Sequence, residues 1–191
     1  MRPLAIVFAL WAVILTHEVS CLLAGHRSYG LTMEYNNMDR TNDLKVYTSG
    51  YHEGKDPVVV ARVDKESGTI FLIGAWTYHD ETPSKLHLDQ ILMAIWKRRG
   101  NTGAMLRRFH LINCVNENTV KAAQNARQIK GKATEPLEVT QNDGDAWLAL
   151  YNSPFGKAAR RMASKAEKRV SKVSLGQFVD DETENIDFYF T

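Results

Sequence analysis

The sequence predicts a single α+β domain with a mixed or antiparallel sheet and several packed helices. Short runs rich in β-branched and aromatic residues occupy positions 44–51, 58–63 and 69–78, which is typical of strands. Segments with apolar residues at helical spacing follow. Between them, residues 109–115 are apolar at both alternating positions, which indicates a central strand covered on both faces.

The N-terminal region has the layout of a secretory signal peptide. Arg2 precedes an uncharged apolar run at positions 4–15, and the small residues Ser20, Cys21 and Ala24 follow it. This run is shorter than the roughly 20 residues that a spanning helix needs. We therefore expect residues 1–24 to be a cleaved leader, 25–43 a flexible arm, and 44–191 the folded domain.

Cysteine content and net charge narrow the class of protein only slightly. The chain has two cysteines, and Cys21 lies at the expected cleavage site, so Cys114 would remain alone in the core strand. No disulfide-linked oligomer is expected, and a reducing place of action is compatible with this pattern. The net charge of +2 is too small to identify a partner.

Helix signals surround the central strand. Thr82 can cap a helix with Pro83 in its first turn, and Gly100 can end it. This helix carries one apolar face: Leu88, Ile91, Leu92, Ile95 and Trp96. After the strand, Asn116 or Asn118 can cap a helix that ends at Gly131.

The C-terminal part continues with short elements. A brief strand is expected at 137–140, a turn at 142–144, and a short helix capped by Asp145 that runs to Tyr151. Ser153 and Pro154 begin a longer helix that we expect to reach Lys172. Residues 186–190 can form a closing strand.

The expected helix at 154–172 is the candidate surface for an anionic partner. Four cations fall close to one helical stripe: Lys157, Arg161, Lys165 and Lys172. A polyanion or an acidic protein surface would be attracted to them. The alternative is an ordinary solvated helix face. An acidic tail at 176–191, with Asp180, Asp181, Glu182 and Glu184, can either lie against the helix and neutralise it or stay flexible and solvated.

A second candidate site rests on histidine chemistry. His79 and His87 lie where a strand passes into a helix, and Arg108 shares a strand face with His110. Histidine with a carboxylate can transfer protons, and arginine can bind a phosphate. No metal-ligand spacing is present, and no cofactor is expected. For Trp147 and Tyr151, helical spacing favours core packing over base stacking.

The sequence favours two functions over a third, an extracellular structural or adhesion module. The first is a secreted, non-enzymatic protein that binds a macromolecular partner, either a protein or a polyanion. The leader, the size and the few cysteines are similar in general type to the small secreted effectors of filamentous pathogens or symbionts. That likeness leaves open an action in the cytoplasm or nucleus of a recipient cell. The alternative is a secreted nuclease or phosphoesterase that uses His79, His87 or His110 with Arg108.

Overall fold

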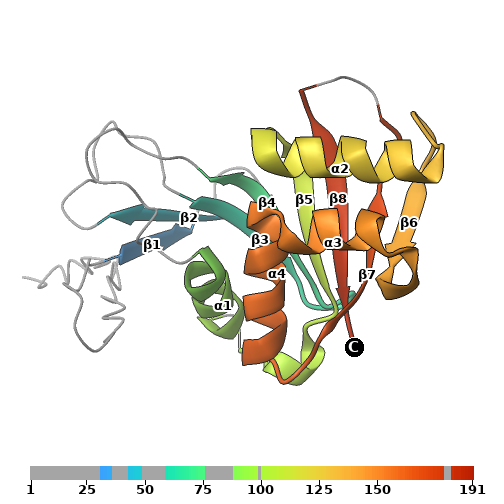
Figure 1. The fold of residues 1–191 in the computed structure, drawn as a ribbon. Helices are drawn as coiled ribbons and strands as arrows, with labels where there is room; N and C mark the ends of the chain where they lie inside the picture. The colour runs from blue at the N-terminus through green and yellow to red at the C-terminus, as the bar shows by residue number, and fades with distance from the viewer. Residues whose placement is uncertain (1–30, 36–42, 49–58, 76–87, 99, 179–181) are drawn as a thin grey trace, which may run out of the picture.

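The protein forms an eight-stranded sheet with helices packed against it (Figure 1). The structure is a computed structural model, and it describes residues 31–35, 43–48, 59–75, 88–98, 100–178 and 182–191. The predicted α+β domain with a mixed sheet is confirmed. The predicted leader at 1–24 and Cys21 lie outside the described residues.

Among the described residues, four strands precede the helix α1 and four follow it. The first four are β1 (Leu31–Tyr35), β2 (Asp43–Thr48), β3 (Val59–Asp64) and β4 (Thr69–Ala75). The later strands are β5 (Arg108–Cys114), β6 (Leu137–Thr140), β7 (Val170–Leu175) and β8 (Glu184–Phe190). The described helices are α1 (Leu88–Arg98), α2 (Glu117–Lys130), α3 (Asp145–Asn152) and α4 (Pro154–Lys165).

The strand order across the sheet is β1-β2-β3-β4-β5-β8-β7-β6. Neighbouring strands are antiparallel except for β4 and β5, which are parallel and joined through α1. The last strand of the chain, β8, is inserted between β5 and β7. Two strands far apart in the sequence, β5 and β8, therefore pair in the middle of the sheet.

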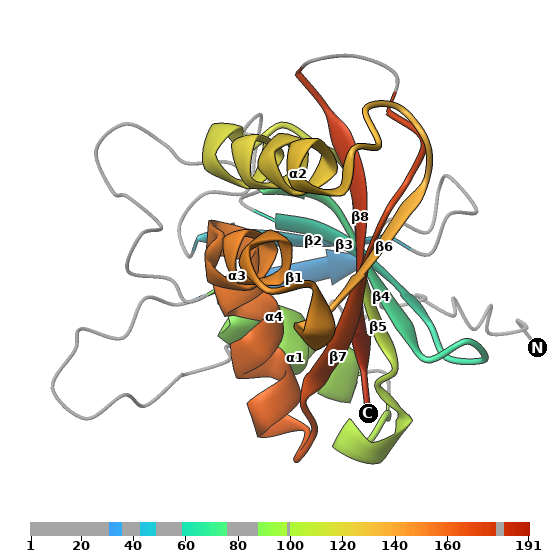
Figure 2. The ribbon, with the colours of Figure 1, turned by 45° about the vertical axis from the view of Figure 1, so that its right-hand side comes forward.

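All four described helices cover the same face of the sheet, as Figure 2 shows. The core lies between the two layers, where Trp96, Phe109, Met162 and Phe188 are fully buried. The Trp96 indole N–H donates to the Thr102 carbonyl at 2.8 Å, which satisfies its polar atom. The predicted packing role of Trp147 is confirmed, because its side chain is buried.

Local signals explain most helix boundaries. The Asn116 side chain accepts from the Thr119 amide at the start of α2, and Gly131 ends it at φ 64°. Ser153 caps α4 by accepting from the Gly156 amide. The predicted cap Asp145 is instead the first residue of α3, and Gly144 precedes it at φ 53°.

Two strands were missed in the sequence. The expected flexible arm at 25–43 contains β1, which pairs with β2 in antiparallel register.

The expected helix at 154–172 is also wrong in its last part, because α4 ends at Lys165 and β7 follows. Glu167 adopts φ 57° and lets the Lys168 amide reach the Ala163 carbonyl at 2.8 Å. This helix end uses a left-handed residue that is not glycine, so no sequence signal marked it.

The prediction for the central strand at 109–115 also needs correction. Phe109 and Leu111 of β5 are buried under the helices, whereas Arg108 and His110 are half-buried on the opposite face. The expectation of cover on both faces is wrong for the described part of the chain, because all four described α-helices lie on one side of the sheet. No described helix is long and apolar enough to cross a membrane. Within the same residues Cys114 is a free, buried thiol, and burial raises its pKa.

Candidate functional site

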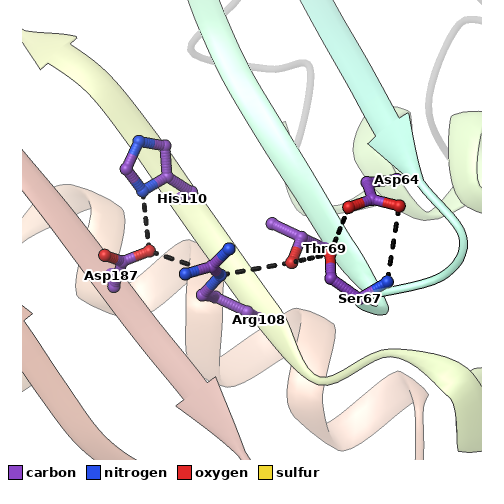
Figure 3. Close-up of polar contacts among 6 residues, drawn as sticks. All are labelled: Asp64, Ser67, Thr69, Arg108, His110 and Asp187. Atoms are coloured by element: carbon purple, nitrogen blue, oxygen red, sulfur yellow. Dashed lines mark hydrogen bonds and ion pairs between the residues drawn. The ribbon is translucent and has the colours of Figure 1, made fainter.

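A polar network lies on the face of the sheet opposite the helices. It joins side chains from β5, β8, β4 and the turn between β3 and β4 (Figure 3). Strand alternation places them, because every second residue of β5 points away from the core. Arg108 and His110 are therefore neighbours on this open face, with the core residue Phe109 between them in sequence.

The centre of the network is a histidine–carboxylate pair. The Nδ1 atom of His110 lies 2.6 Å from Oδ1 of Asp187, on the adjacent strand β8. The two side chains are 20% and 19% exposed, so solvent reaches them but does not surround them. With Nδ1–H donated to the carboxylate, Nε2 is the nitrogen left to exchange a proton with a ligand.

Arg108 brings a permanent positive charge to the same carboxylate. Its Nε lies 3.6 Å from Oδ1 of Asp187 and donates to the Thr69 hydroxyl at 3.2 Å. The side chain is 30% exposed, which leaves part of the guanidinium accessible. An arginine held in this way is suited to binding a phosphate or carboxylate group.

A chain of hydroxyl groups supports Thr69 from the β3–β4 turn. The Ser67 hydroxyl lies 2.7 Å from that of Thr69 and 2.6 Å from Oδ2 of Asp64. Asp64 also accepts the Glu66 and Ser67 amides, which closes the turn. The Ser67 hydroxyl is the main cause that lowers the pKa of Asp64, so this end of the network carries a negative charge.

A cleft opens where the two parallel strands β4 and β5 separate, and His110 is not among the residues that line it. The pairing of β4 with β5 ends at Leu72 and Leu111, one residue beyond His110. A cleft of about 270 Å³ follows, lined by residues of both strands and by Phe155 of α4. Asn113, one of the residues that line the cleft, has φ 46° at an irregularity of β5. Its backbone N–H donates to the side-chain Oδ1 of Asn185. Such irregularities are common beside functional sites.

The structure brings only part of the predicted histidine site together. His110 and Arg108 converge on Asp187, while His79 and His87 lie outside the described residues. Asp187 was missed because the sequence placed it in an acidic tail, 77 positions from His110. Only the insertion of β8 beside β5 makes them partners.

The predicted cationic stripe is not a single surface. Lys157 is exposed on α4, but Lys165 bonds to the buried Asp89 of α1, and Arg161 lies 3.8 Å from the same carboxylate. Lys172 belongs to β7 and pairs with Glu138 at 2.6 Å. The helix ends before Lys172, so the four cations cannot align on it.

The expected acidic tail is also corrected from residue 184 onward. Glu184 begins β8 and is buried against Arg127, with Oε1 and the arginine Nη2 3.0 Å apart. Burial raises the pKa of Glu184, and Arg127 opposes that change. Asp180 and Asp181 lie outside the described residues. The two acids of β8, Glu184 and Asp187, therefore pair with Arg127 and with the candidate site, and they do not cover α4.

The described residues contain no group of three or more metal-ligating side chains. The candidate site is defined by the contacts among Arg108, His110 and Asp187. Comparison of the chain with protein-family models, with curated proteins and with solved structures gives no match.

Proposed function

We propose that the protein is an exported hydrolase that cleaves phosphoesters by acid–base chemistry at His110. The observation that carries this proposal is the 2.6 Å contact between His110 and Asp187, with Arg108 beside the same carboxylate. Export rests on the predicted leader in the sequence. The three side chains divide the work that phosphoryl transfer requires.

His110 acts as the base and then as the acid. Its Nε2 takes the proton from the attacking hydroxyl, whose oxygen forms the new bond to phosphorus. The bond from phosphorus to the leaving oxygen breaks, and the imidazolium returns the proton to that oxygen. Asp187 is a positioning residue that fixes the ring and stabilises its charged form. Arg108 contacts the phosphate oxygens, where negative charge gathers.

The test compares His110→Gln and Asp187→Asn with the unaltered protein on a chromogenic phosphodiester and on RNA. His110→Gln should lower kcat by roughly 10²-fold or more, because the proton acceptor is lost. Asp187→Asn keeps the volume of the side chain but not its charge, so the pH–rate profile should change shape. Glu117→Gln is the control, since Glu117 is an exposed carboxylate on α2, on the helix-covered side of the sheet, and pairs with Lys121.

Equal rates in the unaltered protein and in His110→Gln would refute the hydrolase proposal. The alternative, action through binding alone, is supported by the aromatic and cationic side chains on the same open face. A protein that only binds would show no His110-dependent turnover on either substrate.

A further inference from the structure

We propose that the open face of the sheet binds single-stranded RNA, with Phe71 and Tyr189 as base-stacking platforms on either side of the His110 site. This inference rests on the proposed phosphoester chemistry and names the substrate class. It begins from side chains that the acid–base step does not use. They lie on β4, β8 and β7, and β5, which carries Arg108 and His110, lies between β4 and β8.

The strand register fixes the spacing of these side chains. Phe71 is the partner of His110 across β4 and β5, and Tyr189 is the partner of Arg108 across β5 and β8. Lys172 of β7 is in turn the partner of Tyr189. All are half-buried on the face opposite the described helices. The two aromatic rings thus lie on either side of β5, which carries His110, with Phe71 on β4 and Tyr189 on β8.

Arg108 occupies the space between the two rings. Its Cζ lies 6.0 Å from the Phe71 ring centroid and 5.9 Å from that of Tyr189. The rings are therefore no farther apart than these two distances together, a gap that nucleotides of an extended strand can bridge. Bases stack on aromatic rings and on guanidinium planes, and single strands expose the faces that such stacking needs.

The Phe71 ring also meets the histidine. Its centroid lies 5.2 Å from that of His110 in an edge-to-face arrangement. A base stacked on Phe71 would place its own ribose and phosphate beside His110. On the other flank, the Lys172 ammonium lies 4.7 Å from the Tyr189 ring, where it can meet a backbone phosphate.

RNA fits the chemistry because it carries its own nucleophile. His110 removes the proton of the 2′-hydroxyl, and the 2′-oxygen bonds to the adjacent phosphorus. The bond to the 5′-oxygen breaks, and that oxygen receives the proton. The products are a 2′,3′-cyclic phosphate and a free 5′-hydroxyl, with no oxidant or further reactant needed.

Carboxylates on the same face limit its positive charge. Asp187 lies beside Arg108, Glu138 pairs with Lys172, and Asp64 closes the β3–β4 turn. The contact with Glu138 is the main cause that raises the pKa of Lys172. Stacking should therefore supply most of the affinity, and its salt dependence should be shallow compared with that of a basic groove.

The binding test uses a labelled single-stranded DNA oligonucleotide, which cannot be cleaved through a 2′-hydroxyl. Tyr189→Leu should weaken its binding roughly tenfold or more. Tyr151→Leu is the matched control, because Tyr151 also has a guanidinium over its ring, Arg160 at 4.4 Å, but lies on α3. Phe71→Leu is the second variant, and circular dichroism checks that each variant is folded.

The outcomes separate this inference from the proposed function. Loss of binding in Tyr189→Leu and Phe71→Leu, with retention in Tyr151→Leu, supports the platform. His110→Gln should keep binding and lose cleavage of single-stranded RNA. If no single strand binds while the chromogenic phosphodiester is still cleaved, the RNA inference fails and the hydrolase stands. Equally tight binding of duplex RNA or heparin also overturns it, because neither offers free base faces.

Discussion

Arg127 shows how much a single buried charge contributes to this domain. It is 2% exposed and donates to the Glu184 carboxylate and to the backbone carbonyls of Glu135 and Gly176. Its guanidinium also lies 5.4 Å from the Phe178 ring. One side chain therefore joins α2 to the segments that begin β6 and connect β7 with β8. The buried Arg127–Glu184 ion pair fixes the relative positions of these segments as much as it stabilises them.

Removing Arg127 should be far more costly than removing an exposed cation. Arg127→Met leaves Glu184 buried without its partner and should lower the free energy of unfolding by about 3–5 kcal/mol. The control Lys130→Met, which breaks the more exposed pair with Asp143, should cost no more than about 1 kcal/mol. Urea denaturation of both variants checks this. A similar small loss in both would show that Arg127 has no special role.

At the scale of elements, the contact between α1 and α4 depends on a buried carboxylate. Asp89 lies in the first turn of α1 and is 2% exposed. Lys165 and Arg161 of α4 supply its positive partners. These two cations are therefore part of the packing of two helices. A binding surface composed of the whole predicted stripe would compete with that role.

Charge reversal on α4 tests this conclusion. Lys165→Glu would set two carboxylates against each other beside the core, and we expect it to cost more than about 1 kcal/mol of unfolding free energy. Lys157→Glu on the same helix should be nearly neutral, because Lys157 is exposed. Thermal melts of the two single variants provide the comparison. If both melt together with the unaltered protein, the Asp89 contact does not stabilise the fold.

At the scale of the whole molecule, the two faces of β8 have different tasks. Ile186, Phe188 and Phe190 point into the core, and Phe188 stacks with Phe109 at a centroid distance of 6.1 Å. Asp187 and Tyr189 point to the open face and belong to the candidate site. Because all the described helices pack on one side of the sheet, its other side can serve for recognition.

Neighbouring substitutions in β8 should separate stability from binding. Phe188→Ala should lower the free energy of unfolding by about 3–5 kcal/mol, because it leaves a cavity in a fully buried site. Tyr189→Leu should cost less than that and act on the oligonucleotide affinity. Urea denaturation measures the first effect, and the titration described above measures the second. A larger loss of stability in Tyr189→Leu would contradict the assignment of the two faces.

The sequence by itself determined the elements with strong local signals. The apolar face of α1, the Asn116 cap with Gly131 in α2, and the presence of a strand at β5 all depend on interactions within a few positions. It also identified Arg108 and His110 as neighbours on one strand face, because alternation along a strand is a local property.

Only the tertiary structure decided which residues complete the site. Asp187 joins His110 because β8 is inserted between β5 and β7, and nothing in a local pattern specifies that order. Glu167 ends α4 in a left-handed conformation without glycine, so Lys172 moved from a predicted helix to a strand. The exposure of one face of the sheet was likewise decided by the tertiary structure. Helix amphipathicity shows that each helix packs on something, and strand pairing and connection geometry decide that all described helices share one side.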